Sequence, residues 1–230
     1  MTIPSASAKA AGFDLPGRQK LMNGTGNSKF DSLVFDLGKV IIDFDPMRAI
    51  RRLEGRTPYS TAELLARMKE TDAVVRFESG ALTSEHFYTE IAAHLKLGVS
   101  FVEFIPIWSD IFMDELILDK PFFERLKPRY RLVLLSNTNA MHAAFLRNRF
   151  PVLDVFDSQI LSHEVGAMKP SDKIYNAATN AARTTPERMF YVDDIPAYVE
   201  AASRLGWVAV PFQGKERLVR DMQALGIHLD

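Results

Sequence analysis

The chain has 230 residues, of which 47% are hydrophobic and 25% are charged, with a formal net charge of -1 and no cysteine. This composition suits one large globular domain, or a core domain with a smaller insert, and it supplies enough apolar side chains for a sizeable core. It excludes a global field that would draw the protein to nucleic acid or an anionic membrane, and it excludes disulfides, thiolate metal sites and a cysteine nucleophile.

Residues 1 to 29 are predicted to form a poorly ordered tail, because they are rich in Ser, Ala and Gly and show no periodicity. They lack the apolar core of a secretory signal, and their few acids leave a mitochondrial presequence as a minor alternative. No apolar run approaches the ~20 residues needed to span a bilayer. We therefore expect no membrane association, and the lack of cysteine fits a cytoplasmic location.

The first firm element is Ser32 to Phe35, an apolar run before the turn Asp36-Leu37-Gly38. Such a run is typical of a buried parallel strand. The pattern recurs over 132–135 and 189–192, with weaker versions over 158–161 and 208–210. Helical patterns lie between these strands, over 139–149, 171–182, 196–205 and 216–225. This alternation predicts an α/β fold with a doubly wound, mostly parallel sheet.

Residues 46 to 115 break the alternation, since they contain no strand pattern. They contain helical segments instead, at Met47–Leu53, Thr61–Met68, Ser84–Leu95 and Phe101–Phe112. We therefore predict a small helical cap over 46–115, inserted after the first strand, and an α/β core formed by 30–45 and 116–230.

Three polar clusters follow the three firm strands directly. They are Asp36-Leu37-Gly38, Ser136-Asn137-Thr138 and Asp193-Asp194, and a fourth, Lys169-Pro170, follows a weaker strand after a short loop. Because parallel strands end at the same edge of a sheet, and ligands of open α/β sheets bind at that edge, these clusters are predicted to converge there.

Carboxylates and a lysine in this arrangement suit phosphate chemistry. A strand-end carboxylate such as Asp36 can attack phosphorus or bind a metal, and Gly38 leaves its carbonyl free to face the site. The adjacent acids Asp193 and Asp194 are costly unless a cation lies near, and Mg²⁺ prefers such oxygen ligands. Lys169 would supply the positive charge that a phosphoryl group needs.

Ser136 and Asn137 offer hydroxyl and amide groups near a helix start, which suit phosphate oxygens. Each cluster also has an ordinary structural explanation: a turn aspartate, a helix N-cap, a solvated lysine, or acids favouring the next helix N-terminus. The order of all four clusters along the chain is much more specific than any one of them.

From Phe35 to Asp194, this order resembles the four motifs of the haloacid dehalogenase superfamily, and Phe77 to Phe87 is similar to the helical cap of that family's phosphatases. The Asp-Leu-Gly opening looks most like the branch that contains alpha-D-glucose-1-phosphate phosphatase. The resemblance implies a phosphatase acting on a small phosphorylated metabolite, with sugar phosphates as one class. It leaves the oligomeric state open.

The resemblance also implies a role for each motif. Asp36 would be the nucleophile that forms an aspartyl-phosphate. Magnesium would be held by Asp36, the carbonyl of Gly38 and Asp194, with Asp193 supporting from beside it. Ser136 and Asn137 would hold phosphate oxygens, and Lys169 would balance the charge on the nucleophile and the phosphoryl group.

Three positions depart from the family pattern. Gly38 stands where most family phosphatases carry a second aspartate as acid and base, Lys39 stands where glycine or asparagine is common, and Tyr198 replaces a usual asparagine. Two alternatives therefore stay open: a metal-independent 2-haloacid dehalogenase, whose nucleophile motif also lacks the second aspartate, and a non-catalytic phosphate-binding relative. The pair Asp193-Asp194 argues against the dehalogenase.

Overall fold

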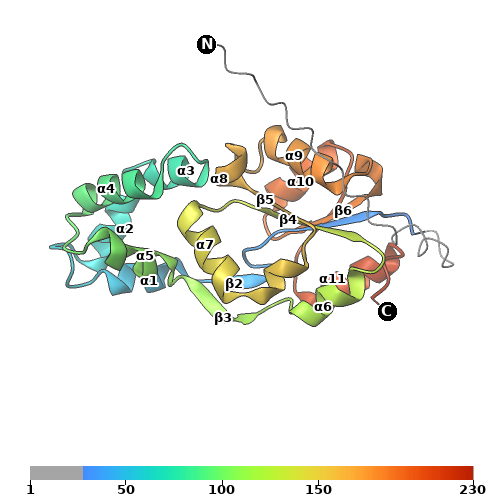
Figure 1. The fold of residues 1–230 in the computed structure, drawn as a ribbon, viewed down its shortest axis with the longest axis horizontal. Helices are drawn as coiled ribbons and strands as arrows, with labels where there is room; N and C mark the ends of the chain where they lie inside the picture. Colours follow the sequence, from blue (N-terminus) through green and yellow to red (C-terminus); the bar gives the residue numbers. More distant parts are fainter. Residues whose placement is uncertain (1–27, 230) are drawn as a thin grey trace, which may run out of the picture.

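The computed structural model describes residues 28–229 and has a five-stranded parallel sheet at its core (Figure 1). The strand order is β5-β4-β1-β6-β7, and each neighbouring pair is parallel. The strands are β1 (Ser32–Phe35), β4 (Arg131–Ser136), β5 (Ser158–Leu161), β6 (Met189–Asp193) and β7 (Val208–Pro211). The predicted fold class is confirmed. The predicted tail, 1 to 29, lies outside the described residues except for Ser28 and Lys29.

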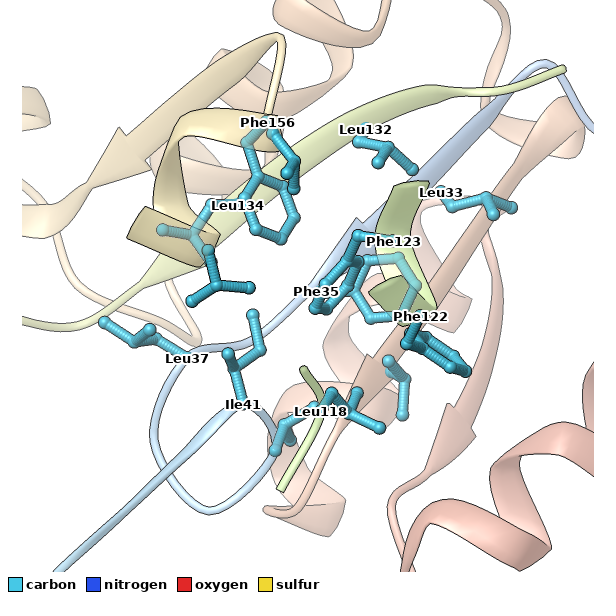
Figure 2. Close-up of a cluster of buried hydrophobic side chains, with 14 of the residues drawn as sticks. Leu33, Phe35, Leu37, Ile41, Leu118, Phe122, Phe123, Leu132, Leu134 and Phe156 are labelled. Carbon is cyan, nitrogen blue, oxygen red and sulfur yellow. The ribbon is translucent and has the colours of Figure 1, made fainter. Parts of the chain in front are cut away.

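Helices cover both faces of the sheet, because successive side chains of a strand point to opposite faces and both sets are apolar here. Val34 and Tyr191 contribute to the cluster on one face, and Phe35 and Val192 to the cluster on the other. In Figure 2, Phe35 lies among the side chains of the second cluster, and its ring centroid is 5.0 Å from that of Phe123.

One face packs against α9 (Asp172–Ala182) and α10 (Pro196–Arg204), and the other against α6 (Lys120–Leu126), α7 (Ala140–Arg149) and α11 (Lys215–Ala224). The shorter elements are η2 (Pro151–Val155), α8 (Ser162–Val165) and η3 (Pro186–Arg188). In the part of the chain that is described, none of the helices combines the length and apolar character needed to cross a bilayer.

The cap follows the first strand, as predicted, and its helices lie to one side of the sheet (Figure 1). A hydrophobic cluster fills the cap, and Met141 of α7 joins it from the core. Phe77 stacks on Phe87 with ring centroids 4.3 Å apart, and Phe87 packs against Trp108 at 4.9 Å. The cap helices are α1 (Pro46–Arg52), α2 (Thr61–Met68), α3 (Ala73–Glu78), α4 (Ser84–Leu95) and α5 (Phe101–Ser109).

A two-stranded antiparallel ribbon joins cap and core. It consists of β2 (Ile42–Phe44) and β3 (Phe112–Leu116). The predictions of a helix over Phe101–Phe112 and of no strand within 46–115 were therefore wrong. The helix ends at Ser109, and Phe112 pairs with Phe44 across the ribbon, where the ring centroids are 6.4 Å apart. The predicted cap limits, 46 and 115, stay a prediction.

Candidate functional site

The carboxyl ends of β4, β1 and β6 lie side by side, as the motif order predicted. Ser136 is the last residue of β4, Asp36 directly follows β1, and Asp193 is the last residue of β6. The N–H of Asp36 donates to the carbonyl oxygen of Val192 at 3.0 Å, so pairing between β1 and β6 continues up to the site. Strand pairing therefore fixes where these polar residues stand.

Three carboxylates and one amine meet at this edge. One oxygen from each of Asp36, Asp193 and Asp194 lies within 4.8 Å of the others. The Lys169 Nζ lies 2.7 Å from Asp36 Oδ1 and 2.6 Å from Asp193 Oδ2, and its side chain is 1% exposed. Because a buried ion pair is costly to break, this geometry holds the Asp36 carboxylate in a fixed position.

The loop that carries Lys169 is attached to the loop after β4 by two hydrogen bonds. The N–H of Lys169 donates to Asn137 Oδ1 at 2.7 Å, and Asn137 Nδ2 donates to the carbonyl of Lys169 at 3.1 Å. The peptide bond between Lys169 and Pro170 is cis. The side chain of Asn137 thus positions Lys169, and a contact of Asn137 with phosphate stays a prediction.

Tyr198, one of the three residues that depart from the family pattern, also contacts Asn137 and Lys169. Its hydroxyl accepts a hydrogen bond from Asn137 Nδ2 at 3.3 Å, and its ring centre lies 5.0 Å from the Lys169 amine. An aromatic face at that distance stabilises a cation. Ser136 is 3% exposed, and its hydroxyl donates only a long bond, 3.4 Å, to the carbonyl of Asn137.

The charges in this cluster do not balance. Burial raises the pKa of Asp36 to about 7, against the opposing effect of Lys169. Burial also disfavours the charged form of Lys169, but Asp36 and Asp193 outweigh it and raise the pKa of the amine. Burial, followed by the charge of Asp193, raises the pKa of Asp194. Three acids share one amine, so a further cation would stabilise their ionised forms.

The oxygen atoms present suit a hard divalent cation such as magnesium. Both oxygens of Asp193 accept hydrogen bonds: Oδ2 accepts from Lys169 and the Tyr191 hydroxyl, and Oδ1 accepts from the N–H of Ile195 at 2.8 Å. Within residues 28–229, the Asp194 carboxylate accepts no side-chain hydrogen bond and the carbonyl of Gly38 accepts none at all. The oxygens with the fewest hydrogen bonds, and so the most accessible to a metal, are those of Asp194 and the Gly38 carbonyl, beside the Asp36 carboxylate that Lys169 contacts through Oδ1.

The turn after Asp36 is shaped by Phe44. A Cβ atom placed on Gly38 would lie 2.8 Å from Cε1 of Phe44. Lys39 has a positive φ of 59°, and its amine bonds to the Asp43 carboxylate and donates to the carbonyl of Phe44 at 2.8 Å. The Lys39 side chain is 44% exposed, which favours a solvated loop residue over a direct member of the carboxylate cluster.

A cavity of about 310 Å³ lies beside the site, with walls from both core and cap. Gly38 and the loop Ser136 to Thr138 form part of its core side. Glu78, Trp108 and His142 also line it. The motifs did not identify Glu78 or His142 as site residues, although the acid before the Ser79-Gly80 turn was a detectable signal for Glu78.

One hydrogen-bonded connection fixes α3 of the cap to the core. The Ser162 hydroxyl lies 2.6 Å from the carbonyl oxygen of Glu78 and 2.9 Å from that of Thr138, and its single hydrogen serves one of them at a time. The hydroxyl oxygen of Ser162 also accepts a hydrogen bond from the N–H of Thr138 at 2.8 Å. The end of α3 is thereby tied to the loop after β4.

A second connection fixes α5. Asn139 Nδ2 lies 3.0 Å from His142 Nδ1, and His142 Nε2 lies 3.0 Å from the carbonyl of Trp108. An amide N–H donates, so Nδ1 is the acceptor and Nε2 carries the proton that Trp108 accepts. Burial lowers the pKa of His142 to about 4, and the ring is therefore neutral near pH ~7.

Comparison with known proteins assigns this arrangement to a family. The family model for haloacid dehalogenase-like hydrolases matches residues 30–206. D-ribitol-5-phosphate phosphatase of Bacteroides thetaiotaomicron is 24% identical over 182 residues, covering 76% of this chain and 88% of that protein. A phosphatase of Mycobacterium tuberculosis is 28% identical over 222 residues, covering 86% and 96%.

Solved structures agree with this family assignment. The crystal structure of a haloacid dehalogenase family enzyme from Bacteroides thetaiotaomicron matches with a TM-score of 0.76 and 26% identity, covering 85% of this chain and 99% of that one. The wild-type form of that enzyme, in complex with magnesium and inorganic phosphate, matches with a TM-score of 0.73, covering 80% and 95%. The chain belongs to the haloacid dehalogenase-like hydrolases.

Proposed function

We propose that this protein is a magnesium-dependent phosphatase that hydrolyses a small phosphate monoester through an aspartyl-phosphate on Asp36. The observation that carries the proposal is the convergence of Asp36, Asp193 and Asp194 around Lys169 at the strand ends. Two relatives named as phosphatases, and a structural neighbour crystallised with magnesium and phosphate, support it.

Magnesium would be held by Asp36, Asp194 and the carbonyl of Gly38, with Asp193 supporting from beside it. When bound, the ion neutralises charge on the phosphoryl group and offsets the excess of acids. Asp193 contributes mainly by fixing Lys169, because both of its carboxylate oxygens already accept hydrogen bonds.

The covalent step is an attack by a carboxylate oxygen of Asp36 on phosphorus. The new P–O bond forms as the ester P–O bond breaks, and the organic group departs with the oxygen of that bond, which takes a proton from solvent water. Water then cleaves the aspartyl-phosphate, releasing inorganic phosphate and restoring Asp36. Lys169 balances charge on Asp36 and on the transferring group, while Ser136 and Asn137 hold phosphate oxygens.

The charge of the cluster disfavours the dehalogenase alternative. That reaction uses no metal, so three acids would face the carboxylate of a 2-haloacid with only Lys169 to offset them. Like charges at such short distances repel strongly in a buried site. The non-catalytic phosphate-binding alternative is distinguished by the experiment below.

The test measures phosphate release from an activated aryl phosphate, with and without Mg²⁺. We expect magnesium-dependent hydrolysis that Asp36→Asn abolishes, since the amide keeps the shape but is not a nucleophile. Asp114→Asn is the matched control, because that carboxylate is 78% exposed and its ion pair is with Arg149 on the surface. Hydrolysis that survives Asp36→Asn would refute the mechanism, and a folded, magnesium-loaded protein that hydrolyses no ester would support the binding alternative.

A further inference from the structure

The side chains that line the cavity beside the carboxylate cluster restrict which substrates can bind. We propose that it binds the organic group of the phosphate ester, and that this group is mainly apolar and carries one hydroxyl that hydrogen-bonds to Glu78. This inference rests on the proposed phosphatase function and names the substrate class of the same site.

The position of the cavity assigns it to the organic group. Gly38 lies two residues after the nucleophile, and Ser136, Asn137 and Thr138 form the loop expected to hold phosphate oxygens; all four line the cavity. An ester with its phosphorus beside Asp36 therefore extends its remaining atoms into this space. At about 310 Å³ the cavity is at the lower end of the size range of ligand sites, which limits the organic group to a small one.

The cap side of the cavity is mostly hydrocarbon. It includes Ile50, Leu65, Met68 and Val74, and the ribbon adds the ring of Phe44. A polyhydroxylated group would place several hydroxyls against these apolar side chains, where contact with hydrocarbon leaves them without hydrogen-bond partners, which is unfavourable. An aromatic or branched aliphatic group would instead bury apolar surface against them.

Glu78 is the acid on this wall. Within residues 28–229, no hydrogen bond or ion pair reaches its carboxyl group. Its backbone is fixed by the Ser162 hydroxyl, 2.6 Å from its carbonyl. Two residues further on, a Cβ on Gly80 would lie 2.2 Å from the carbonyl oxygen of His163, so this turn sits directly against the core. Glu78 is therefore placed at the cavity without a partner of its own.

Trp108 supplies a second unsatisfied group. It lines the cavity, and its indole N–H is buried without a hydrogen-bond partner in the described part of the chain. An unpaired buried group of this kind is uncommon in native interiors, and beside the half-buried carboxyl group of Glu78 on the same wall, partner-free among the described residues, it indicates a polar atom of a ligand. Burial raises the pKa of Glu78. A hydroxyl group can hydrogen-bond to this side chain in either protonation state, because it can donate to a carboxylate and accept from a carboxylic acid.

The test compares esters of primary alcohols, so that the leaving groups are chemically alike. Initial rates at limiting substrate give kcat/KM for benzyl phosphate, 4-(hydroxymethyl)benzyl phosphate, ribitol 5-phosphate and glucose 6-phosphate. We expect both benzyl esters to exceed both polyol esters by ~10-fold or more, and the hydroxymethyl ester to exceed benzyl phosphate. Polyol esters that match or exceed the benzyl esters would overturn the inference but leave the proposed function intact.

Variants of Glu78 separate recognition from folding. Glu78→Gln should keep the preference for the hydroxymethyl ester, because the amide can still hydrogen-bond, whereas Glu78→Met should remove it through a higher KM for that ester alone. For any one variant, the ratio of the kcat/KM values of two substrates does not depend on the fraction of the protein that is folded. An unchanged ratio in Glu78→Met would overturn the role of Glu78. Failure to hydrolyse any ester would instead count against the phosphatase function.

Discussion

Substitution of Gly38 tests why this chain lacks the second aspartate of its family. In Gly38→Asp the new carboxyl group would stand two residues after the nucleophile, where most family phosphatases carry an acid. The structure predicts that Phe44 prevents it, since the first atom of any side chain would lie 2.8 Å from Cε1 of that ring. Carbon atoms in favourable contact are ~3.5–4.0 Å apart, so the ring must move by roughly 1 Å.

The cost of that movement follows from how the ring is held. Phe112 packs against Phe44 across the ribbon, and the Lys39 amine lies 5.0 Å from the centre of the Phe44 ring. Overpacking of this kind typically costs ~1–3 kcal/mol. We expect Gly38→Asp to lose about that much free energy of unfolding and to gain no activity. We expect Phe44→Ala to make room, so that the double variant regains stability relative to the sum of the single changes.

The assay combines urea unfolding with phosphate release from two esters. With the ring removed, the carboxyl group introduced by Gly38→Asp can protonate the leaving oxygen, and general acid catalysis is typically worth ~10²–10⁴-fold. The gain should appear with an alkyl phosphate and be small with 4-nitrophenyl phosphate, which needs no acid. Gly38→Ala separates the effect of Cβ from that of the carboxyl group. The reasoning is refuted if Gly38→Asp alone is as stable as the parent and more active toward the alkyl ester.

Three other substitutions test the site and its supports. Lys169→Met leaves Asp36 and Asp193 buried without a counter-ion, so urea unfolding should show a loss of ~3–5 kcal/mol; a loss below ~1 kcal/mol would contradict the paired geometry. The pKa of His142 is lowered from an ordinary 6.5 to about 4 in the fold. The stability that the neutral ring contributes is therefore fully present above pH 6.5 and is lost as the pH falls toward 4. Between pH ~7.5 and ~5 the free energy of unfolding should fall by ~2 kcal/mol because of His142, and His142→Gln should remove this part of the pH dependence. If His142→Gln leaves the pH dependence of unfolding unchanged, the prediction is wrong. Lys39→Asn should change magnesium affinity, measured by calorimetry, by less than ~3-fold, because its amine is exposed and held by Asp43; a large increase would place the amine in the site.

The sheet could be predicted because its strands are buried on both faces. Runs such as Ser32 to Phe35 are then continuously apolar and end at turns, so their limits are visible in the sequence. Helix starts were similarly visible. Ser60 and Glu63 form a capping box that begins α2 where it was predicted, and Asn139 caps α7 as expected. These signals are local, so no knowledge of tertiary contacts was needed.

The ribbon could not be predicted in the same way. Its strands β2 and β3 are far apart in the sequence, and they are defined by their pairing with each other rather than by a periodic pattern. The segment after Ser109 is apolar enough to continue a helix, but its pairing with β2, which includes the contact of Phe112 with Phe44, makes it a strand. Tertiary contacts override local propensity in such short segments.

The site was predictable to the level of which motifs converge, because parallel topology alone places strand ends together. What each side chain does there depends on neighbours from distant loops. The amide of Asn137 holds the backbone of Lys169, although the sequence indicated only a polar group suited to phosphate. Glu78 lines the cavity because α3 docks against Ser162, and no periodicity in the cap contains that information.

The missing carboxyl at position 38 and the apolar cavity have a common physical origin in Phe44. The ring fills the space into which a side chain at position 38 would extend, and it also forms part of the cavity wall. Under the proposed function, the esters that pack well against this ring are those whose organic group is aromatic or otherwise apolar. Aryl esters have good leaving groups, which need less help from an acid than alkyl esters do. Among the apolar esters that this cavity suits, aryl esters are therefore the ones that least require the acid that Gly38 cannot supply. A kcat that depends steeply on leaving-group pKa across a series of substituted phenyl phosphates would follow from this, and a flat dependence with fast turnover would show that another group donates the proton or that a later step limits the rate.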